Sequence, residues 1–225
     1  MIEQANIVRE RRKTIKIIVD KNGKLIVFCP YGLSLTQVDE ILKSKERAIL
    51  NKISNAKQLN ENYSDIINGK SILLFGKEYK LAFSPKIKKP SFSDEYFFVP
   101  EKYLRAGNIN LCIKKTIKEI ASRVIAARLK EISQANNAYA YVAKIVIGDF
   151  HAKWGSCDSK SVIKFNWRLA MLCQQIIDFV IYHEITHLKE MNHSKRFYFE
   201  LEKICPNWKE SREKLKKFAF LLTMY

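Results

Sequence analysis

One segment, from about Gln174 to Glu190, constrains the fold of this chain more than any other. Its apolar residues form two stripes on nearly opposite sides of a helix: Ile177, Ile181, Ile185 and Leu188 on one side, Ile176 and Val180 on the other. A helix that is apolar on two sides must be covered on both. We therefore predict that this helix lies inside a domain.

Three of the four histidines of the chain lie on or just after this segment. His183 and His187 form the pattern H-E-x-x-H, so that in a helix both imidazoles leave one face about a turn apart and can bind one ion. Glu184 projects beside them and can accept a proton from a water molecule that the ion activates. The pattern predicts a metal site with its own base.

A catalytic zinc ion usually has three protein ligands. We expect His193 to be the third, because an imidazole on the turn that follows the helix otherwise has no role. Asn192 adopts the left-handed conformation easily and is expected to end the helix, while Ser194 is expected to cap the next one. A carboxylate on that next helix, Glu200 or Glu202, is the alternative ligand.

Composition limits the class of protein. A chain of 225 residues with 47% hydrophobic content can bury a substantial core. It has no apolar run of about 20 residues, and its start lacks the order of a signal peptide, so we expect a cytoplasmic protein and no membrane contact. The five cysteines are scattered without a C-x-x-C pair, which argues against disulfides and against a cysteine zinc ribbon.

The chain is strongly basic, with a net charge of +17. This charge favours binding to nucleic acid, nucleotides or an acidic partner, but the basic residues are spread along the sequence from Arg9 to Lys217. Ordinary solvated lysines are the alternative explanation.

The pattern of elements changes near residue 105. Before it, we predict hairpins over Thr14–Phe28 and Ile72–Phe83, the second turning at Gly76-Lys77, and a helix from Ser34 or Thr36 to about Ala56. After it, the predicted elements are a long helix over 113–133, strands over 141–148 and 161–169, and the helix of the metal site. The fold class is therefore α+β: an amino-terminal β-rich region, 1–105, packed on a carboxy-terminal zincin-like metallohydrolase domain, 106–225, with a small sheet beside the metal-binding helix.

Four motifs extend the metal site: Trp154 to Cys157, Asn166 to Leu169, Ile177 to Leu188, and Asn192 to Phe197. With them the chain resembles the YgjP-like family of predicted metal-dependent hydrolases, zincin-type metallopeptidase domains that are also similar to the SprT and WLM groups. The resemblance covers nearly the whole chain, since three earlier segments fit as well: Arg11 to Ile15, Pro30 to Ser34, and Phe75 to Tyr79.

The resemblance implies one Zn²⁺ ion, with Glu184 as the catalytic acid/base and with three ligands, His183, His187 and His193. It also implies that the Asn166–Leu169 strand lies beside the metal cleft as an edge that pairs with an extended peptide. The candidate substrate contacts are thus Asn166, Trp167 and Arg168. Trp154 and Trp167 are nevertheless expected mainly in the core.

Two alternative interpretations, membership of the metzincins and a cysteine–histidine nucleophile pair, fit the sequence less well. The histidine spacing equals that of the metzincins, but Glu190 stands where they have glycine. Cys157 and His151 lack a visible third group to orient them as a nucleophile pair. In the family that the chain resembles, another residue is more often found at the position of His151, so we assign His151 no role.

Three functions fit these residues. The first is a zinc-dependent cytoplasmic peptidase. The second is a metal-dependent nucleotide phosphohydrolase, although Gly76-Lys77 lacks the other residues of a phosphate-binding loop. The third is a nucleic-acid-associated protease or binding module, although no nucleic-acid-binding motif is present. The motif indicates hydrolysis more firmly than any substrate, and the sequence does not indicate an oligomeric state.

Overall fold

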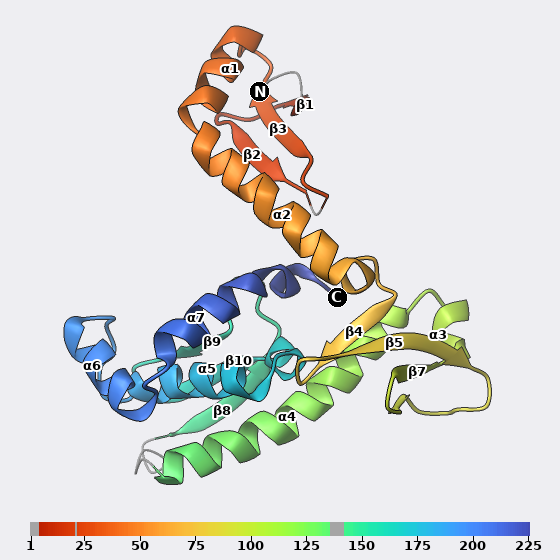
Figure 1. The fold of residues 1–225 in the computed structure, drawn as a ribbon, viewed down its shortest axis with the longest axis vertical. Helices are drawn as coiled ribbons and strands as arrows, with labels where there is room; N and C mark the ends of the chain where they lie inside the picture. The colour runs from red at the N-terminus through yellow and green to blue at the C-terminus, as the bar shows by residue number, and fades with distance from the viewer. Residues whose placement is uncertain (1–4, 21, 136–141) are drawn as a thin grey trace. The chain divides into compact units, whose positions relative to one another are not determined.

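The computed structural model describes residues 5–20, 22–135 and 142–225. The chain forms two compact units, Met1–Gly69 and Lys70–Tyr225 (Figure 1). The described residues combine helices with three small mixed sheets, which confirms the α+β class. The predicted division near residue 105 falls inside the second unit, between α3 (Glu101–Arg105) and α4 (Ile109–Ala135).

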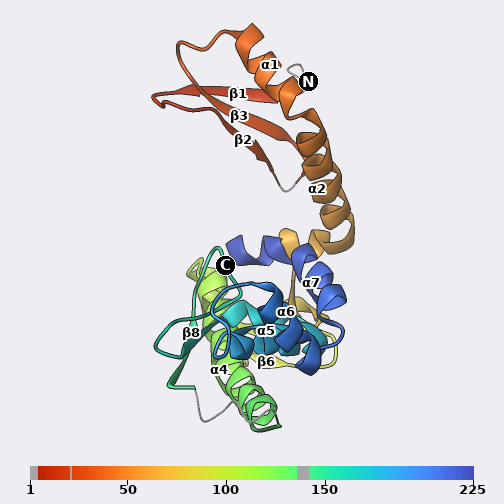
Figure 2. The ribbon, with the colours of Figure 1, turned by 90° about the vertical axis from the view of Figure 1, so that its left-hand side faces the viewer.

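The first unit is a three-stranded sheet covered by two helices (Figure 2). Its elements are β1 (Ala5–Glu10), β2 (Lys16–Val19), β3 (Leu25–Pro30), α1 (Leu35–Ser44) and α2 (Glu46–Ile67). The central strand, β3, pairs antiparallel with β2 and parallel with β1. Alternate residues of β3 are buried, and they form one core with residues of both helices: Leu25, Val27, Cys29, Val38, Leu42 and Ile49.

The predicted hairpin corresponds to β2 and β3, with Lys21 of its turn outside the described residues. Ser34 is the N-cap of α1, in a complete capping box with Gln37. The prediction of one continuous helix is wrong, because the backbone leaves helical geometry at Lys45, with φ −113° and ψ 9°. A second helix, α2, then begins at Glu46. The sequence analysis also did not identify β1.

The second unit begins with a four-stranded sheet in the order β4-β5-β7-β6. Its strands are β4 (Ser71–Leu74), β5 (Lys77–Ser84), β6 (Ser91–Phe92) and β7 (Tyr96–Pro100). The β4–β5 hairpin turns at Phe75 and Gly76, one residue before the predicted turn, and both have positive φ, 51° and 79°.

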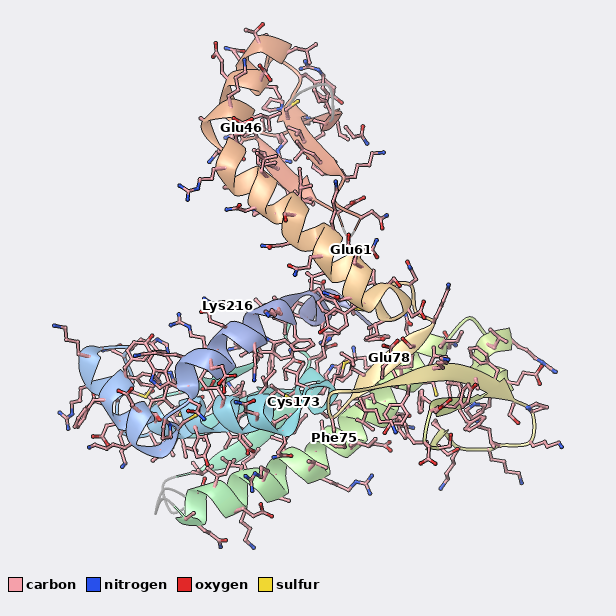
Figure 3. All side chains as sticks on the ribbon, viewed as in Figure 1. Glu46, Glu61, Phe75, Glu78, Cys173 and Lys216 are labelled. Carbon is pink, nitrogen blue, oxygen red and sulfur yellow. The ribbon has the colours of Figure 1, made fainter. Side chains whose placement is uncertain are left out.

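The tip of this hairpin fixes the start of the helix predicted to bind metal. A β-carbon on Gly76 would lie 2.9 Å from the Cβ of Cys173, the residue that precedes α5 (Gln174–Thr186). The N–H groups of Phe75 and Gly76 donate to the carbonyls of Ala170 and Met171. Figure 3 labels Phe75 and Cys173 at this contact. Only a residue without a side chain fits at position 76.

A second small sheet, in the order β8-β10-β9, lies beside α5 (Figure 1). Its strands are β8 (Lys144–Gly148), β9 (Gly155–Cys157) and β10 (Val162–Asn166); Tyr141 of the predicted strand lies outside the described residues. The predicted strand over 161–169 is too long, because the chain turns into a 3-10 helix, η3 (Trp167–Met171), after β10. The side chain of Asn166 accepts the N–H of Arg168 and so begins this helix.

Helices complete the second unit. The long helix α4 turns a buried stripe toward α5 and η3: Cys112, Ile113, Ile117, Ala121, Ile125, Leu129 and Ile132. Arg128 of α4 donates twice to Asp178 of α5, at 2.8 Å, and so fixes the angle between the two helices. The chain continues through α6 (Lys195–Ile204), α7 (Trp208–Lys217) and the 3-10 helix η4 (Ala219–Thr223). No helix in the described ranges has the length and apolarity needed to cross a membrane.

Candidate functional site

The three histidines of the sequence pattern meet in the structure. Their ligand atoms all lie within 4.8 Å of one another. His183 comes from the last turn of α5, His187 ends that helix, and His193 lies on the exposed turn before α6. The Nε2 atoms of His183 and His193 are 2.9 Å apart. Nitrogens that converge in this way suit a common cation.

The protonation of the rings is consistent with a metal site. The Nδ1 atom of His187 lies 3.0 Å from the carbonyl oxygen of Glu190, so Nδ1 carries the proton and Nε2 keeps its lone pair. Burial, together with His187 and His193, lowers the pKa of His183 to about 3. Burial also lowers the pKa of His187, so both imidazoles favour the neutral form that ligation requires.

The turn between the two helices is tied to its surroundings. Glu190 binds Arg196 at 2.7 Å, and the side chain of Ser194 accepts the N–H of Phe197, which confirms the predicted cap of α6. The left-handed conformation predicted for Asn192 is wrong, because positive φ outside glycine occurs, within the described ranges, only at Phe75, Ser161 and Tyr225. Hydrogen bonds from residues 188 to 190 back to α5 end that helix instead.

Phe197, to which the sequence analysis gave no individual role, supports all three histidines. It is fully buried, and its ring centroid lies 4.9 Å from that of His183, 4.6 Å from that of His187 and 4.8 Å from that of His193. The available signals were its place at the end of the Asn192 to Phe197 motif and its position three residues after the predicted cap.

Glu184 is buried beside the histidines, with 4% of its surface exposed. Its Oε2 atom has no hydrogen-bond partner among the described residues. Burial raises the pKa of this carboxyl to about 8. A buried carboxylate without a partner is costly, so its position calls for a ligand or a functional role. Three convergent imidazoles and an orphaned carboxylate beside them are the donor set that fits a catalytic metal ion.

Strand β9 lies directly against this carboxylate. A β-carbon on Gly155 would be 2.5 Å from the Oε1 atom of Glu184. β9 is an edge strand, whereas β10 is central, so the prediction that the Asn166–Leu169 segment forms the edge strand is wrong. The site therefore has an open strand edge, but a different segment supplies it.

The hydrogen bonds of β9 show which groups face the open edge. Trp154 accepts the N–H of Asn166, and Asp158 donates to the carbonyl of Val162. Because pairing alternates along antiparallel strands, residues 154, 156 and 158 face β10. The N–H and C=O groups of Gly155 and Cys157 consequently point to the open edge.

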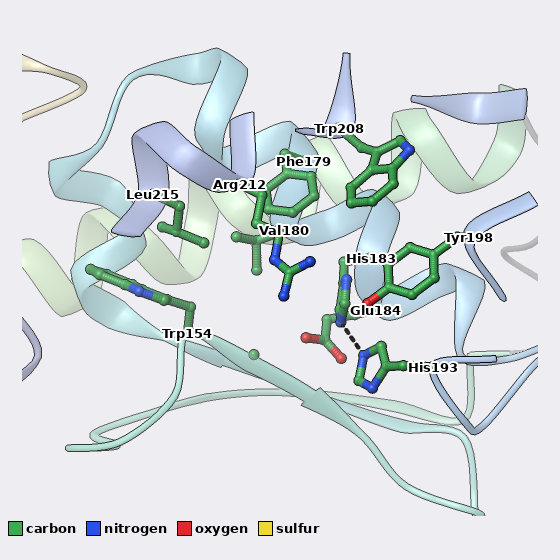
Figure 4. Close-up of a pocket in the computed structure, with 11 residues that line it drawn as sticks. Trp154, Phe179, Val180, His183, Glu184, His193, Tyr198, Trp208, Arg212 and Leu215 are labelled. Carbon is green, nitrogen blue, oxygen red and sulfur yellow. Dashed lines mark hydrogen bonds between the residues drawn. The ribbon is translucent and has the colours of Figure 1, made fainter. Parts of the chain in front are cut away.

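A cavity of about 360 Å³ opens over Glu184 (Figure 4). Its walls are mostly apolar and come from the residue before β9 and from α5, α6 and α7: Trp154, Phe179, Val180, Tyr198, Trp208 and Leu215. Arg212 extends its guanidinium into this space toward His183 and Glu184 (Figure 4). It forms no ion pair among the described residues. The sequence analysis did not single out Arg212, because nothing in the sequence of α7 distinguishes it from the other basic residues.

The three predicted substrate contacts lie elsewhere. Asn166, Trp167 and Arg168 are fully buried, and none lines the cavity. The guanidinium of Arg168 donates to the carbonyl of Met224 and to Asp149, so it binds the last described residues to the loop after β8. Direct contact with a substrate stays a prediction for these three residues. Core packing is confirmed for Trp167, whereas Trp154 lines the cavity.

Three further residues that the sequence analysis considered lie in other surroundings. Burial and the carboxylates of Glu184 and Asp158 raise the pKa of Cys157 to about 11, which keeps it a thiol at neutral pH. His151 lies 3.4 Å from the carbonyl of Leu222. Glu200, the alternative ligand, pairs with Lys203 at 2.6 Å and with Lys189 at 3.8 Å.

The fold and the histidine cluster place this chain among α+β proteins with a site suited to a metal ion. More specifically, the chain belongs to the YgjP-like family: the model of the YgjP-like metallopeptidase domain matches residues 13–218. The family supports a metal-dependent hydrolase. No curated protein and no solved structure matches the chain.

Proposed function

We propose that this protein is a zinc-dependent peptidase in which Glu184 is the catalytic base. The observation that carries the proposal is the buried, unpartnered carboxylate of Glu184 beside three convergent imidazoles and an open strand edge. His183, His187 and His193 would hold the ion. When bound in such a site, zinc polarises a carbonyl group and lowers the pKa of a water molecule toward 7.

The residues of the chain supply the remaining steps. The charge of a bound zinc ion would lower the raised pKa of Glu184, so that Glu184 could accept a proton from the attacking water and return it to the nitrogen of the leaving amine. Arg212 faces the negative charge that develops on the substrate oxygen, in a cavity whose apolar walls exclude water and strengthen the interaction. These roles require no movement of α5, whose position is fixed by Asp178 and by the β4–β5 hairpin.

We assign the substrate backbone to the free edge of β9. An extended peptide adds there as a strand, with hydrogen bonds to Gly155 and Cys157, and this places its carbonyl groups beside Glu184. The apolar cavity then accepts a large hydrophobic side chain of the peptide. All five cysteines are free, which suits a cytoplasmic location.

The decisive experiment compares metal content and peptide cleavage in the wild type and in Glu184→Gln. The variant keeps the ligands and should retain zinc, while its cleavage rate falls by about 10²- to 10⁴-fold. Glu40→Gln, which alters an exposed carboxylate on α1, is the matched control and should behave as the wild type. A Glu184→Gln variant with bound metal and full activity would exclude the assigned mechanism.

Arg212 favours a second candidate, a metal-dependent nucleotide phosphohydrolase, because a guanidinium binds phosphate well. Phosphate release from nucleoside triphosphates, measured on the same preparations, distinguishes the two. Release that is lost in Glu184→Gln, without peptide cleavage by the wild type, would favour this candidate.

A further inference from the structure

A second cavity, remote in sequence from the histidines, lies between α4 and the segment that leads from β5 through β6 to α3. Its volume is about 670 Å³, within the range of small-molecule sites. One wall is a single stripe of α4, at helical spacing: Cys112, Lys115, Thr116, Glu119, Ile120 and Arg123. The opposite wall consists of Lys88, Lys89, Pro90, Phe92, Lys102 and Tyr103.

The charge of this cavity is uncompensated. Five basic side chains line it against one carboxylate, that of Glu119, which leaves four positive charges. None of the five forms a salt bridge within the described ranges, although nearby bases do: Arg105 pairs with Glu101, and Lys114 pairs with Asp149. Like charges around one cavity repel each other, and an anion of similar charge density would relieve this repulsion.

The remaining lining adds apolar and aromatic surface. Phe92 stacks on Phe97 at 4.5 Å and meets Tyr79 edge-on at 5.1 Å, so its position is fixed. Lys102 lies over the ring of Tyr103, at 5.2 Å from its centroid. A flat ring attached to the anion therefore finds packing partners at the rim of the same cavity.

We propose that this cavity binds a ligand that carries two or more phosphate groups. A chain of phosphates has the charge density needed to match lysines on both walls, and ammonium groups bind phosphate as point charges. The source of the phosphates is either a free oligophosphate compound, such as a nucleoside triphosphate, or the triphosphate end of a nucleic acid strand. This site would account for part of the net charge of +17 independently of the peptidase reaction.

Binding of inorganic tripolyphosphate to the full-length protein, measured by titration calorimetry, tests the proposal. Lys115→Gln combined with Arg123→Gln should weaken binding by at least about tenfold, since two charge-assisted contacts are lost. Lys118→Gln combined with Lys130→Gln removes the same charge from exposed positions of α4 outside the cavity and should leave the affinity unchanged. Lys89→Gln combined with Lys102→Gln, on the opposite wall, should weaken binding as the first pair does.

Equal losses of affinity in the cavity variants and the control variant would overturn the proposal, because the diffuse positive charge of the protein would then explain the binding. Absence of binding by the wild type at about 0.1 M salt would overturn it as well. Binding at the histidine site would survive all these substitutions, so the test does not depend on the proposed peptidase. Binding of a nucleoside triphosphate is compared with binding of RNA oligonucleotides that carry a triphosphate or a hydroxyl group at the 5′ end, which distinguishes the two sources. Equal affinity for the two kinds of oligonucleotide would contradict a site for a chain of phosphates.

Discussion

Gly155 and Glu184 are in contact across the candidate active site: a β-carbon on Gly155 would lie 2.5 Å from the Oε1 atom of Glu184. The backbone of β9 therefore sets the position of the proposed base, and the glycine is needed for space rather than for an unusual φ. This contact joins the two elements on which the proposed reaction depends, the helix with the histidines and the strand edge that receives the substrate.

Gly155→Ala should lower peptide cleavage by about 10- to 100-fold, because a displacement near 1 Å at a reacting group costs this much. Zinc content should stay at the wild-type level, since the methyl group meets Glu184 and not a histidine. Gly32→Ala is the control, because nothing lies within 4 Å of a β-carbon there. Full activity in Gly155→Ala would show that the carboxylate moves freely.

Phe197→Ala should destabilise the second unit and weaken metal binding together. Removing a fully buried aromatic side chain costs about 3–5 kcal/mol and leaves a cavity beneath all three imidazoles. Urea unfolding of the metal-free protein measures the first effect, and competition with a zinc chelator measures the second. Phe199→Ala, on the same helix but with 60% of its surface exposed, should change both by little. Equal effects of the two substitutions would contradict the supporting role of Phe197.

The parts of the site that were predictable from sequence are local. His183, Glu184 and His187 share one helical turn, and the Ser194 cap is a property of four consecutive residues. Such features depend on spacing along the chain, which the sequence contains directly. The long helix α4 was predictable for the same reason.

The parts that were not predictable depend on contacts between distant segments. Strand β9 is only three residues long and becomes recognisable through its pairing with β10. Arg212 enters the cavity because α7 packs against α5, which no local pattern reveals. The break at Lys45 was missed because the apolar spacing continues across it without proline or glycine.

The buried Arg168 supports the fold rather than the reaction. Arg168→Met should destabilise the protein by about 3–5 kcal/mol, because it leaves the carbonyl of Met224 without its buried donor and removes one of the two charged partners of Asp149. Urea unfolding at pH 7 measures the change. A loss below about 1 kcal/mol would show that Lys114 alone compensates Asp149.

Asp149 should also make stability depend on pH. Burial raises the pKa of this carboxyl, but hydrogen bonds from Lys114 and Arg168 outweigh burial and hold the pKa well below its usual range. Since the folded pKa is below the unfolded value of about 3.9, the contribution is complete above that value and is lost as pH falls toward the folded pKa. Unfolding free energies from pH 6 to pH 3 should therefore decline less steeply in Asp149→Asn than in the wild type. Asp94→Asn, at an exposed turn, is the control and should follow the wild-type slope.

Removal of the metal should lower the melting temperature only while the three-histidine site is intact. A ligand that binds only the folded state stabilises it by about 2.7 kcal/mol at 100 times its Kd, so a chelator should reverse a shift of this size in the wild type. His193→Ala removes the exposed member of the proposed ligand set and should abolish the response to chelator, while the melting temperature of the metal-free protein changes little. His151→Ala removes the one histidine outside the cluster and should keep the full response. If a His193→Ala variant still responded to chelator like the wild type, another residue would have to supply the third ligand. Glu200→Gln would then be the variant to compare.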